Sequence, residues 1–203
     1  MSAAPYIHLD LPGATAQSPA LFLFHGTGGD EHQFTDLAAE LLPGARRIAP
    51  RGDVSEGGAA RYFRRLAEGR YDMADLKRGT DKMGQFVNER LGASRPALVA
   101  GLGYSNGANI LASVLFARPA LFDRAVLMHP LIPFTPPDQT GLAGRRILIT
   151  AGRRDPICPA PASQALADWF SAQGAEVSLV WHEGGHEIRR EELLAARDFL
   201  AAP

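Results

Sequence analysis

The chain has 203 residues, a usual length for a single domain and enough to bury a large core. Hydrophobic residues make up 46% of the sequence, as in ordinary globular proteins, and the net charge of −1 gives no general attraction to nucleic acids or membranes. The single cysteine excludes an intrachain disulfide and is consistent with a reducing compartment. No segment has the pattern of a secretory signal, and no apolar run approaches the roughly 20 residues of a membrane span. We therefore expect one cytoplasmic domain over residues 1–203.

Short apolar runs alternate with amphipathic segments along the whole chain. The predicted strands are Tyr6–Leu9, Leu21–His25, Arg47–Ala49, Ala97–Leu102, Arg124–Met128, Arg146–Ala151 and Glu176–Trp181. The predicted helices are Glu31–Leu41, Gly58–Leu66, Asp72–Leu91, Ser105–Ala117, Pro161–Gln173 and Glu187–Ala201. Several strands are apolar without alternation, as expected when helices cover both faces of a parallel sheet. The pattern predicts a three-layer α/β fold with a mostly parallel central sheet.

The strongest motif is the sequence GYSNG, in which Ser105 lies between a predicted strand and a predicted helix. A G-x-S-x-G sequence in this context is typical of a nucleophile elbow, a sharp turn that exposes the serine hydroxyl at the edge of the sheet. The flanking glycines are needed because a Cβ at either position would collide with the turn. A dinucleotide-binding loop is disfavoured, because the next strand ends in Met128-His129 rather than in an acid for a ribose hydroxyl.

A serine needs a base to take its proton and an acid to orient that base. The chain order at such elbows is serine, acid, histidine, which here selects Asp155 and His186, each after a later strand. Asp155 alone is also typical of a turn before a helix. The alternatives are Glu183 as the acid, and His182 or His129 as the base; we expect His182 at the rim of the site or partly buried, and His129 along the pocket.

The histidines of the segment HEGGH also match the zinc motif H-E-x-x-H. That site requires both histidines on one face of a helix, and two central glycines, each costing about 1 kcal/mol, oppose a helix there. An alternating strand precedes the segment, so we interpret it as a strand-to-helix loop. We predict no metal and no cofactor.

An acyl-transfer site also needs backbone N–H groups that face the developing oxyanion. The sequence predicts one from Asn106, which follows the nucleophile, and one from Thr27 in the loop after LFLF. We expect His25 to pack under that loop as a hydrogen-bonded structural histidine.

With these residues assembled, the sequence resembles the α/β-hydrolase superfamily, in particular its phospholipase/carboxylesterase branch, which includes acyl-protein thioesterases. The stretches LFLFHGTGGDE, GYSNGANI, GRRDPICP and HEGGHEI carry the resemblance, and residues 50–76 resemble small bacterial carboxylesterases linked to methylhydroquinone resistance. The resemblance implies a serine hydrolase with Ser105, His186 and Asp155 as its triad and an acyl-enzyme intermediate. Members of this branch often carry leucine where Thr27 stands.

Only His129–Arg145 separates two strands at the position where many relatives carry a helical cap, so we expect no cap and an open, shallow pocket. Such a pocket suits a small ester or thioester, or an acyl chain presented by a larger molecule. The residues predicted to bind substrate are Gly26, Phe63, His129, Leu131, Ile132, Phe134 and Ile157. Arg61, Arg64 and Arg65 are interpreted as a solvated helix face, with contact to an anionic substrate as the alternative, and Cys158 is interpreted as a small buried hydrophobic residue. The sequence leaves a homodimer open. The alternatives to esterase activity are a lyase, peptidase or C–C bond hydrolase using the same triad, and a non-catalytic binding protein.

Overall fold

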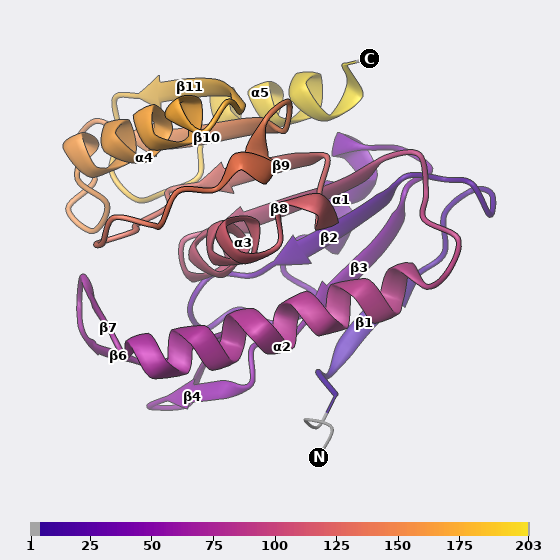
Figure 1. Ribbon diagram of the computed structural model, residues 1–203, viewed down its shortest axis with the longest axis horizontal. Coiled ribbons are helices and arrows are strands. Elements are labelled where there is room, and N and C mark those ends of the chain that lie inside the picture. Colours follow the sequence, from indigo (N-terminus) through magenta and orange to yellow (C-terminus); the bar gives the residue numbers. More distant parts are fainter. Residues whose placement is uncertain (1–4, 203) are drawn as a thin grey trace.

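A computed structural model describes residues 5–202; residues 1–4 and 203, which the predicted single domain also includes, lie outside the described part. The centre of the fold is a seven-stranded sheet (Figure 1). In spatial order its strands are β1 (His8–Leu11), β3 (Arg46–Pro50), β2 (Ala20–Phe24), β8 (Val99–Tyr104), β9 (Arg124–Met128), β10 (Arg146–Gly152) and β11 (Glu176–His182). Neighbouring strands are parallel, except that β1 is antiparallel to β3.

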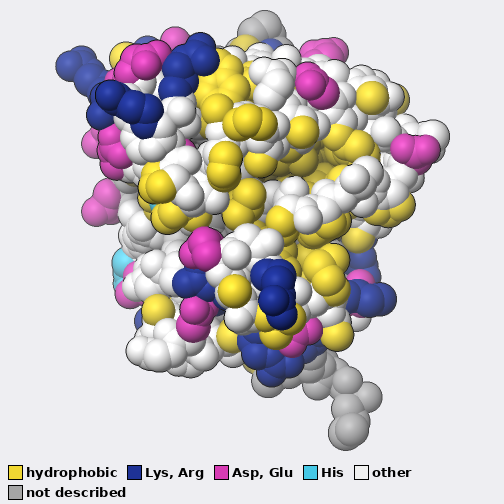
Figure 2. Space-filling view, turned by 90° about the vertical axis from the view of Figure 1, so that its left-hand side faces the viewer, with side chains coloured by type: hydrophobic (Ala, Val, Ile, Leu, Met, Phe, Trp, Pro, Cys, Tyr) yellow, Lys and Arg dark blue, Asp and Glu magenta, His cyan; other side chains and the backbone are white. Residues whose placement is uncertain are grey.

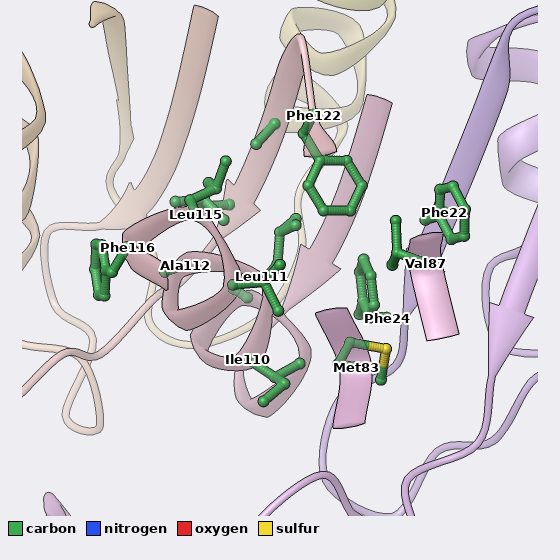
Figure 3. Packing of buried hydrophobic residues seen from close by; sticks show 14 of the residues in the cluster. Phe22, Phe24, Met83, Val87, Ile110, Leu111, Ala112, Leu115, Phe116 and Phe122 are labelled. Atoms are coloured by element: carbon green, nitrogen blue, oxygen red, sulfur yellow. The ribbon is translucent and has the colours of Figure 1, made fainter. Parts of the chain in front are cut away.

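Helices cover both faces of the sheet, as predicted. They are α1 (Thr35–Leu41), α2 (Met73–Leu91), α3 (Asn106–Ala117), α4 (Ala160–Ala172) and α5 (Arg190–Ala201). The sequence of β2 does not alternate because both of its faces are covered. Phe22 and Phe24 belong to a buried cluster that also contains side chains of α2, α3 and α4, whereas Leu21 and Leu23 belong to a second cluster that contains side chains of α1 and α5. Figure 3 shows the first of these cores, where side chains of β2, α2 and α3 meet. The three-layer α/β-hydrolase fold is thus confirmed.

The predicted helix Gly58–Leu66 is wrong. This region forms two short hairpins, β4 (Val54–Glu56) with β5 (Ala59–Arg61), and β6 (Arg65–Ala67) with β7 (Arg70–Tyr71). Gly57 and Gly58 have φ angles of 58° and 92°, which suit the two central positions of a tight hairpin turn and oppose a helix. The three arginines of this region therefore do not share a helix face.

The carboxyl ends of the parallel strands lie at the left in Figure 1, and Figure 2 looks onto that side. Hydrophobic side chains gather across the middle of this surface, with charged side chains above and below. The segment between β9 and β10 contains only the short 3₁₀ turn Thr140–Leu142 and no cap; a second such turn, Pro119–Leu121, precedes β9. Within residues 5–202, every helix is too short or too polar to span a bilayer.

Candidate active site

The turn between β8 and α3 holds Ser105 in a conformation that few residues adopt. Its φ of 52° and ψ of −116° place it in the positive-φ region, and its N–H donates to Met128 O at 2.9 Å. Strain of this kind is stored at functional sites, where the surrounding structure holds the residue in place. The turn carries the hydroxyl beyond the sheet edge, and α3, which begins at Asn106, leaves its first N–H groups without partners inside the helix.

Gly107 is required by this turn, and Gly107→Ala should destabilise the protein by about 3 kcal/mol or more. A Cβ at this position would lie 2.1 Å from Phe24 O and 2.5 Å from His25 O, both backbone atoms that cannot move without distorting β2. Urea unfolding measures the loss. Gly84→Ala is the matched control: there the Cβ meets the flexible end of Arg118, so we expect a change within about 1 kcal/mol. Equal stability losses in the two variants would contradict the assignment of the clash.

Three side chains from separate loops form one hydrogen-bonded chain. Ser105 Oγ lies 2.9 Å from His186 Nε2, and His186 Nδ1 lies 2.7 Å from Asp155 Oδ2. Tyr104 holds the histidine loop, since its hydroxyl donates to His186 O at 2.6 Å and its ring lies 5.3 Å from the imidazole. The structure therefore brings together Ser105, His186 and Asp155, as the sequence predicted.

Asp155 is buried and accepts four hydrogen bonds. Its Oδ1 accepts from the N–H groups of Ile157 and Cys158, and its Oδ2 faces Nδ1 of both His186 and His129. Burial by itself would raise the pKa of Asp155, but the donors at Cys158, His129, His186 and Ile157 outweigh it and hold the pKa below the ordinary value of 3.8. The carboxylate is thus ionised and fixed in orientation at neutral pH.

The segment HEGGH is a loop, and its two histidines point to different partners. Nε2 of His182 lies 3.3 Å from the buried carboxylate of Glu192, while His186 faces Ser105. Glu183 is exposed and pairs with Arg153. The expectation that His182 lies at the rim is wrong, because this residue ends β11 and only 3% of it is exposed.

A cavity of about 210 Å³ opens beside Ser105. Leu131 and Ile157 line it, as predicted, together with Thr27, Asn106 and His186. The sequence indicates Arg61 and Arg65 only as an alternative substrate contact, and it does not single out the other lining residues as pocket walls: Glu68, Tyr71, Tyr104, Asn109 and Cys158. Arg61, Arg65, Glu68 and Tyr71 come from the two hairpins, so a correct β prediction for residues 54–71 could have indicated these four.

The remaining predicted wall residues lie elsewhere. Phe63 is fully buried against the ring of Tyr71, and His129 is buried beneath the triad. Ile132 and Phe134 line a separate apolar groove with Trp169 on α4. Gly26 leaves room for the ring of Tyr104, which a Cβ there would approach to 2.7 Å.

In the loop after β2, the side chain of Thr27 has a definite hydrogen-bond partner. Thr27 Oγ1 accepts a hydrogen bond of 2.6 Å from Arg61 Nη1, and only 3% of Arg61 is exposed. His25 packs below, as expected: its Nδ1–H donates to Gly26 O, and its Nε2 accepts from the N–H of Gly52. The guanidinium thus fixes the side chain of Thr27 beside Ser105. Cys158 is buried, as predicted, and burial raises the pKa of its thiol.

Residues 58–191, which contain the elbow, Asp155 and His186, match the model of the dienelactone hydrolase family. The chain belongs to the dienelactone hydrolase family. It is therefore a hydrolase, and the resemblance to α/β-hydrolases and small carboxylesterases is confirmed.

Relatives of this family member cover nearly its whole length. The Bacillus subtilis (strain 168) protein MhqD, described as a hydrolase, is 37% identical over 181 residues, which are 88% of this chain and 90% of MhqD. Atu2452 from Agrobacterium tumefaciens, a protein of unknown function, is 55% identical to this chain in sequence. Its crystal structure matches with a TM-score of 0.93, over 99% of this chain and 98% of Atu2452. The Bacillus cereus carboxylesterase is 35% identical with a TM-score of 0.89, covering 98% and 94%.

Proposed function

We propose that this chain is a serine hydrolase that cleaves carboxylic esters through an acyl-enzyme intermediate. The observation that carries the proposal is the hydrogen-bonded chain from Ser105 through His186 to Asp155 at the mouth of a cavity. Similarity to the Bacillus cereus carboxylesterase supports esters as the substrate class. A cavity of about 210 Å³ is small for an enzyme pocket, which favours a small acyl or alcohol group.

In the first half of the reaction, Ser105 Oγ attacks the ester carbonyl while its proton passes to His186 Nε2. The N–H groups of Thr27 and Asn106 stabilise the oxyanion, each contributing about 3–4 kcal/mol in the transition state. The tetrahedral intermediate then collapses, the C–O bond to the alcohol breaks, and His186 returns the proton to the leaving oxygen. In the second half, His186 takes a proton from water while the water oxygen attacks the acyl-serine. The bond between the acyl carbon and Ser105 Oγ then breaks, His186 returns the proton to Oγ, and the acid is released.

Fluorophosphonate labelling followed by an ester panel tests the proposal. We expect the probe to attach to Ser105, with mass spectrometry identifying the modified peptide, and hydrolysis of p-nitrophenyl acetate and butyrate. Rates should fall as the acyl chain grows beyond the size of the cavity. Matched thioesters in the same panel separate thioesterase from esterase activity. Labelling at another residue, or no turnover of any ester, would contradict the proposal.

We expect excess EDTA to leave this hydrolysis unchanged. In the HEGGH loop, the N–H of Gly184 donates to His182 Nδ1 at 3.0 Å, so the proton of that neutral imidazole is on Nε2, where a metal would have to bind. The rate before and after dialysis against EDTA is the measurement. A loss of activity that zinc restores would instead identify a metal site in this loop.

A further inference from the structure

A second set of ionisable side chains lies directly beneath the proposed triad. His129 follows β9, His182 ends β11, and Glu192 lies in the first turn of α5. The side chains of these three residues and of Asp155 have no exposed surface. The proposed mechanism uses only Asp155 of this set. Buried ionisable groups are costly unless they are paired, so their pairing should follow one definite arrangement of protons.

The protons can be assigned from the hydrogen-bond partners, beginning at His182. Its Nδ1 accepts from the N–H of Gly184, so its Nε2 carries the proton and donates to Glu192 Oε2 at 3.3 Å. Glu192 Oε2 also accepts from the N–H of Arg189 at 2.6 Å, and its Oε1 accepts from the hydroxyl of Thr150 at 2.6 Å. These three donors leave Glu192 as an ionised acceptor and His182 as a neutral imidazole.

His129 then has a carboxylate at each ring nitrogen. Its Nδ1 lies 2.8 Å from Asp155 Oδ2. Its Nε2 lies 3.0 Å from Glu192 Oε1 and, at the longer distance of 3.4 Å, from Nε2 of His182, so the carboxylate is its nearer partner. A neutral imidazole has only one N–H. Its other nitrogen would then be an acceptor that faces the oxygen of a carboxylate, which is also an acceptor. Both contacts are hydrogen bonds only when both nitrogens carry protons, which makes the ring an imidazolium. The backbone is also held in an unusual conformation here, with a φ of 50° at His129.

We propose that His129 is a positively charged positioning residue, which shares Asp155 with His186 and thereby keeps His186 available as a neutral base at lower pH. This inference rests on the proposed esterase function. The rings of His129 and His186 lie 5.1 Å apart, so a charge on the first opposes a charge on the second. Asp155 in turn divides its charge between two N–H donors and stabilises a protonated His186 less than an unshared carboxylate would.

The pKa directions agree with this arrangement. Burial would lower the pKa of His129, but its contacts with Glu192 and Asp155 outweigh burial and raise the pKa above 6.5. Burial would raise the pKa of Glu192, yet the hydrogen bonds from His129 and Thr150 hold it below 4.5. Three other ionisable groups face His129. His182 accepts the N–H of Gly184 at its Nδ1, and burial raises the pKa of the other two, Tyr104 to about 12 and Cys158 above its ordinary value.

The pH profile of kcat/KM tests the positioning role. Removing the charge with His129→Asn, or removing its partner with Glu192→Gln, should move the acid limb of the profile to higher pH by about one unit. At a pH below the acid limb, a shift of one unit lowers kcat/KM about tenfold relative to the unsubstituted protein. On the alkaline plateau of the profile, the variants and the unsubstituted protein should have the same kcat/KM. The two changes act on one ion pair, so the double variant should show the shift of a single variant.

Thr150→Val is the matched control. It removes a buried hydrogen bond to the same carboxylate and keeps the shape of the side chain, but it removes no charge. It should therefore lower the unfolding midpoint without moving the acid limb. If all three single variants lose stability and none moves the limb, the cluster only supports the fold, and the proposal is overturned.

Nitrogen-15 NMR of the histidine rings in the unsubstituted protein gives a test that needs no substrate and no variant that must fold. The ring of His129, assigned by the proximity of its protons to the rings of Tyr104 and His182, should keep both nitrogens protonated at about pH 8. Loss of one proton near the ordinary value of 6.5 would overturn the proposal. If no ester is hydrolysed, the proposed function fails, but this spectrum still decides the charge of His129.

Discussion

Ser105→Ala should abolish ester hydrolysis, lowering kcat by about 10⁴-fold or more. Oγ of Ser105 is the atom that His186 Nε2 can activate at 2.9 Å, and alanine offers no atom that can form an acyl-enzyme. The substitution should leave the fold intact, because alanine takes the same backbone with no larger side chain. Initial rates with p-nitrophenyl butyrate measure the loss, and circular dichroism on heating checks the fold.

The matched control for this prediction is Ser113→Ala on the same helix that follows the elbow. Ser113 is buried, whereas Ser105 is partly exposed at the cavity; the hydroxyl of Ser113 donates to Asn109 O within the helix and does not line the cavity. We expect its rate to stay within about twofold of the unsubstituted protein. A Ser105→Ala protein that hydrolyses the ester at the unsubstituted rate would end the serine mechanism.

Asp155→Asn should lower kcat by about 10³–10⁴-fold, with little change in KM. The N–H groups of Ile157 and Cys158 both donate to Oδ1, so an asparagine must keep its oxygen there. Its amide nitrogen then faces the Nδ1 atoms of His186 and His129 and donates where the carboxylate accepted. This forces the proton of His186 onto Nε2, where it can no longer accept the proton of Ser105.

Asp123→Asn is the control for Asp155→Asn, because it also replaces a carboxylate that accepts a backbone N–H but lies far from the cavity. Asp123 Oδ2 accepts from the N–H of Val99, and the carboxylate also pairs with Arg95 through both oxygens and with Arg145 through Oδ1, at the end of the sheet opposite the cavity. It should cost stability and leave kcat unchanged. Steady-state kinetics at several pH values separates the two variants. An Asp155→Asn protein that loses less than about tenfold in kcat would show that this residue does not set the tautomer of the base.

The sequence by itself determined the order of strands and helices wherever apolar periodicity was strong. Uniformly apolar runs such as LFLF and ILIT indicated strands covered on both faces, and the structure places them in the middle of the sheet. The same local logic located the elbow at Ser105, because the glycines on either side are demanded by the turn itself. The glycines of HEGGH likewise excluded a helix there. These features depend on neighbours in the chain, which the sequence displays directly.

Local pattern failed between residues 54 and 71, where the sequence predicted a helix over Gly58–Leu66 and the structure has two hairpins. Long-range contacts dominate there: the Tyr62 hydroxyl donates to Pro50 O, the N–H of Tyr62 donates to Asn106 Oδ1, and Arg61 reaches Thr27. Such contacts stabilise extended hairpins that local propensity does not favour. Consequently Arg61 and Arg65 lie in the wall of the cavity and not on the expected solvated helix face, whereas Arg64 is exposed.

Only the tertiary structure decided what lies beneath the proposed triad. Asp155 is 26 residues from His129 in the chain, and Glu192 is 42 residues from Thr150. Their contacts exist because β9, β10 and β11 are adjacent in the sheet and α5 packs behind them. A sequence records which residues can ionise. The burial and the partners that fix their charges arise only when distant strands lie side by side.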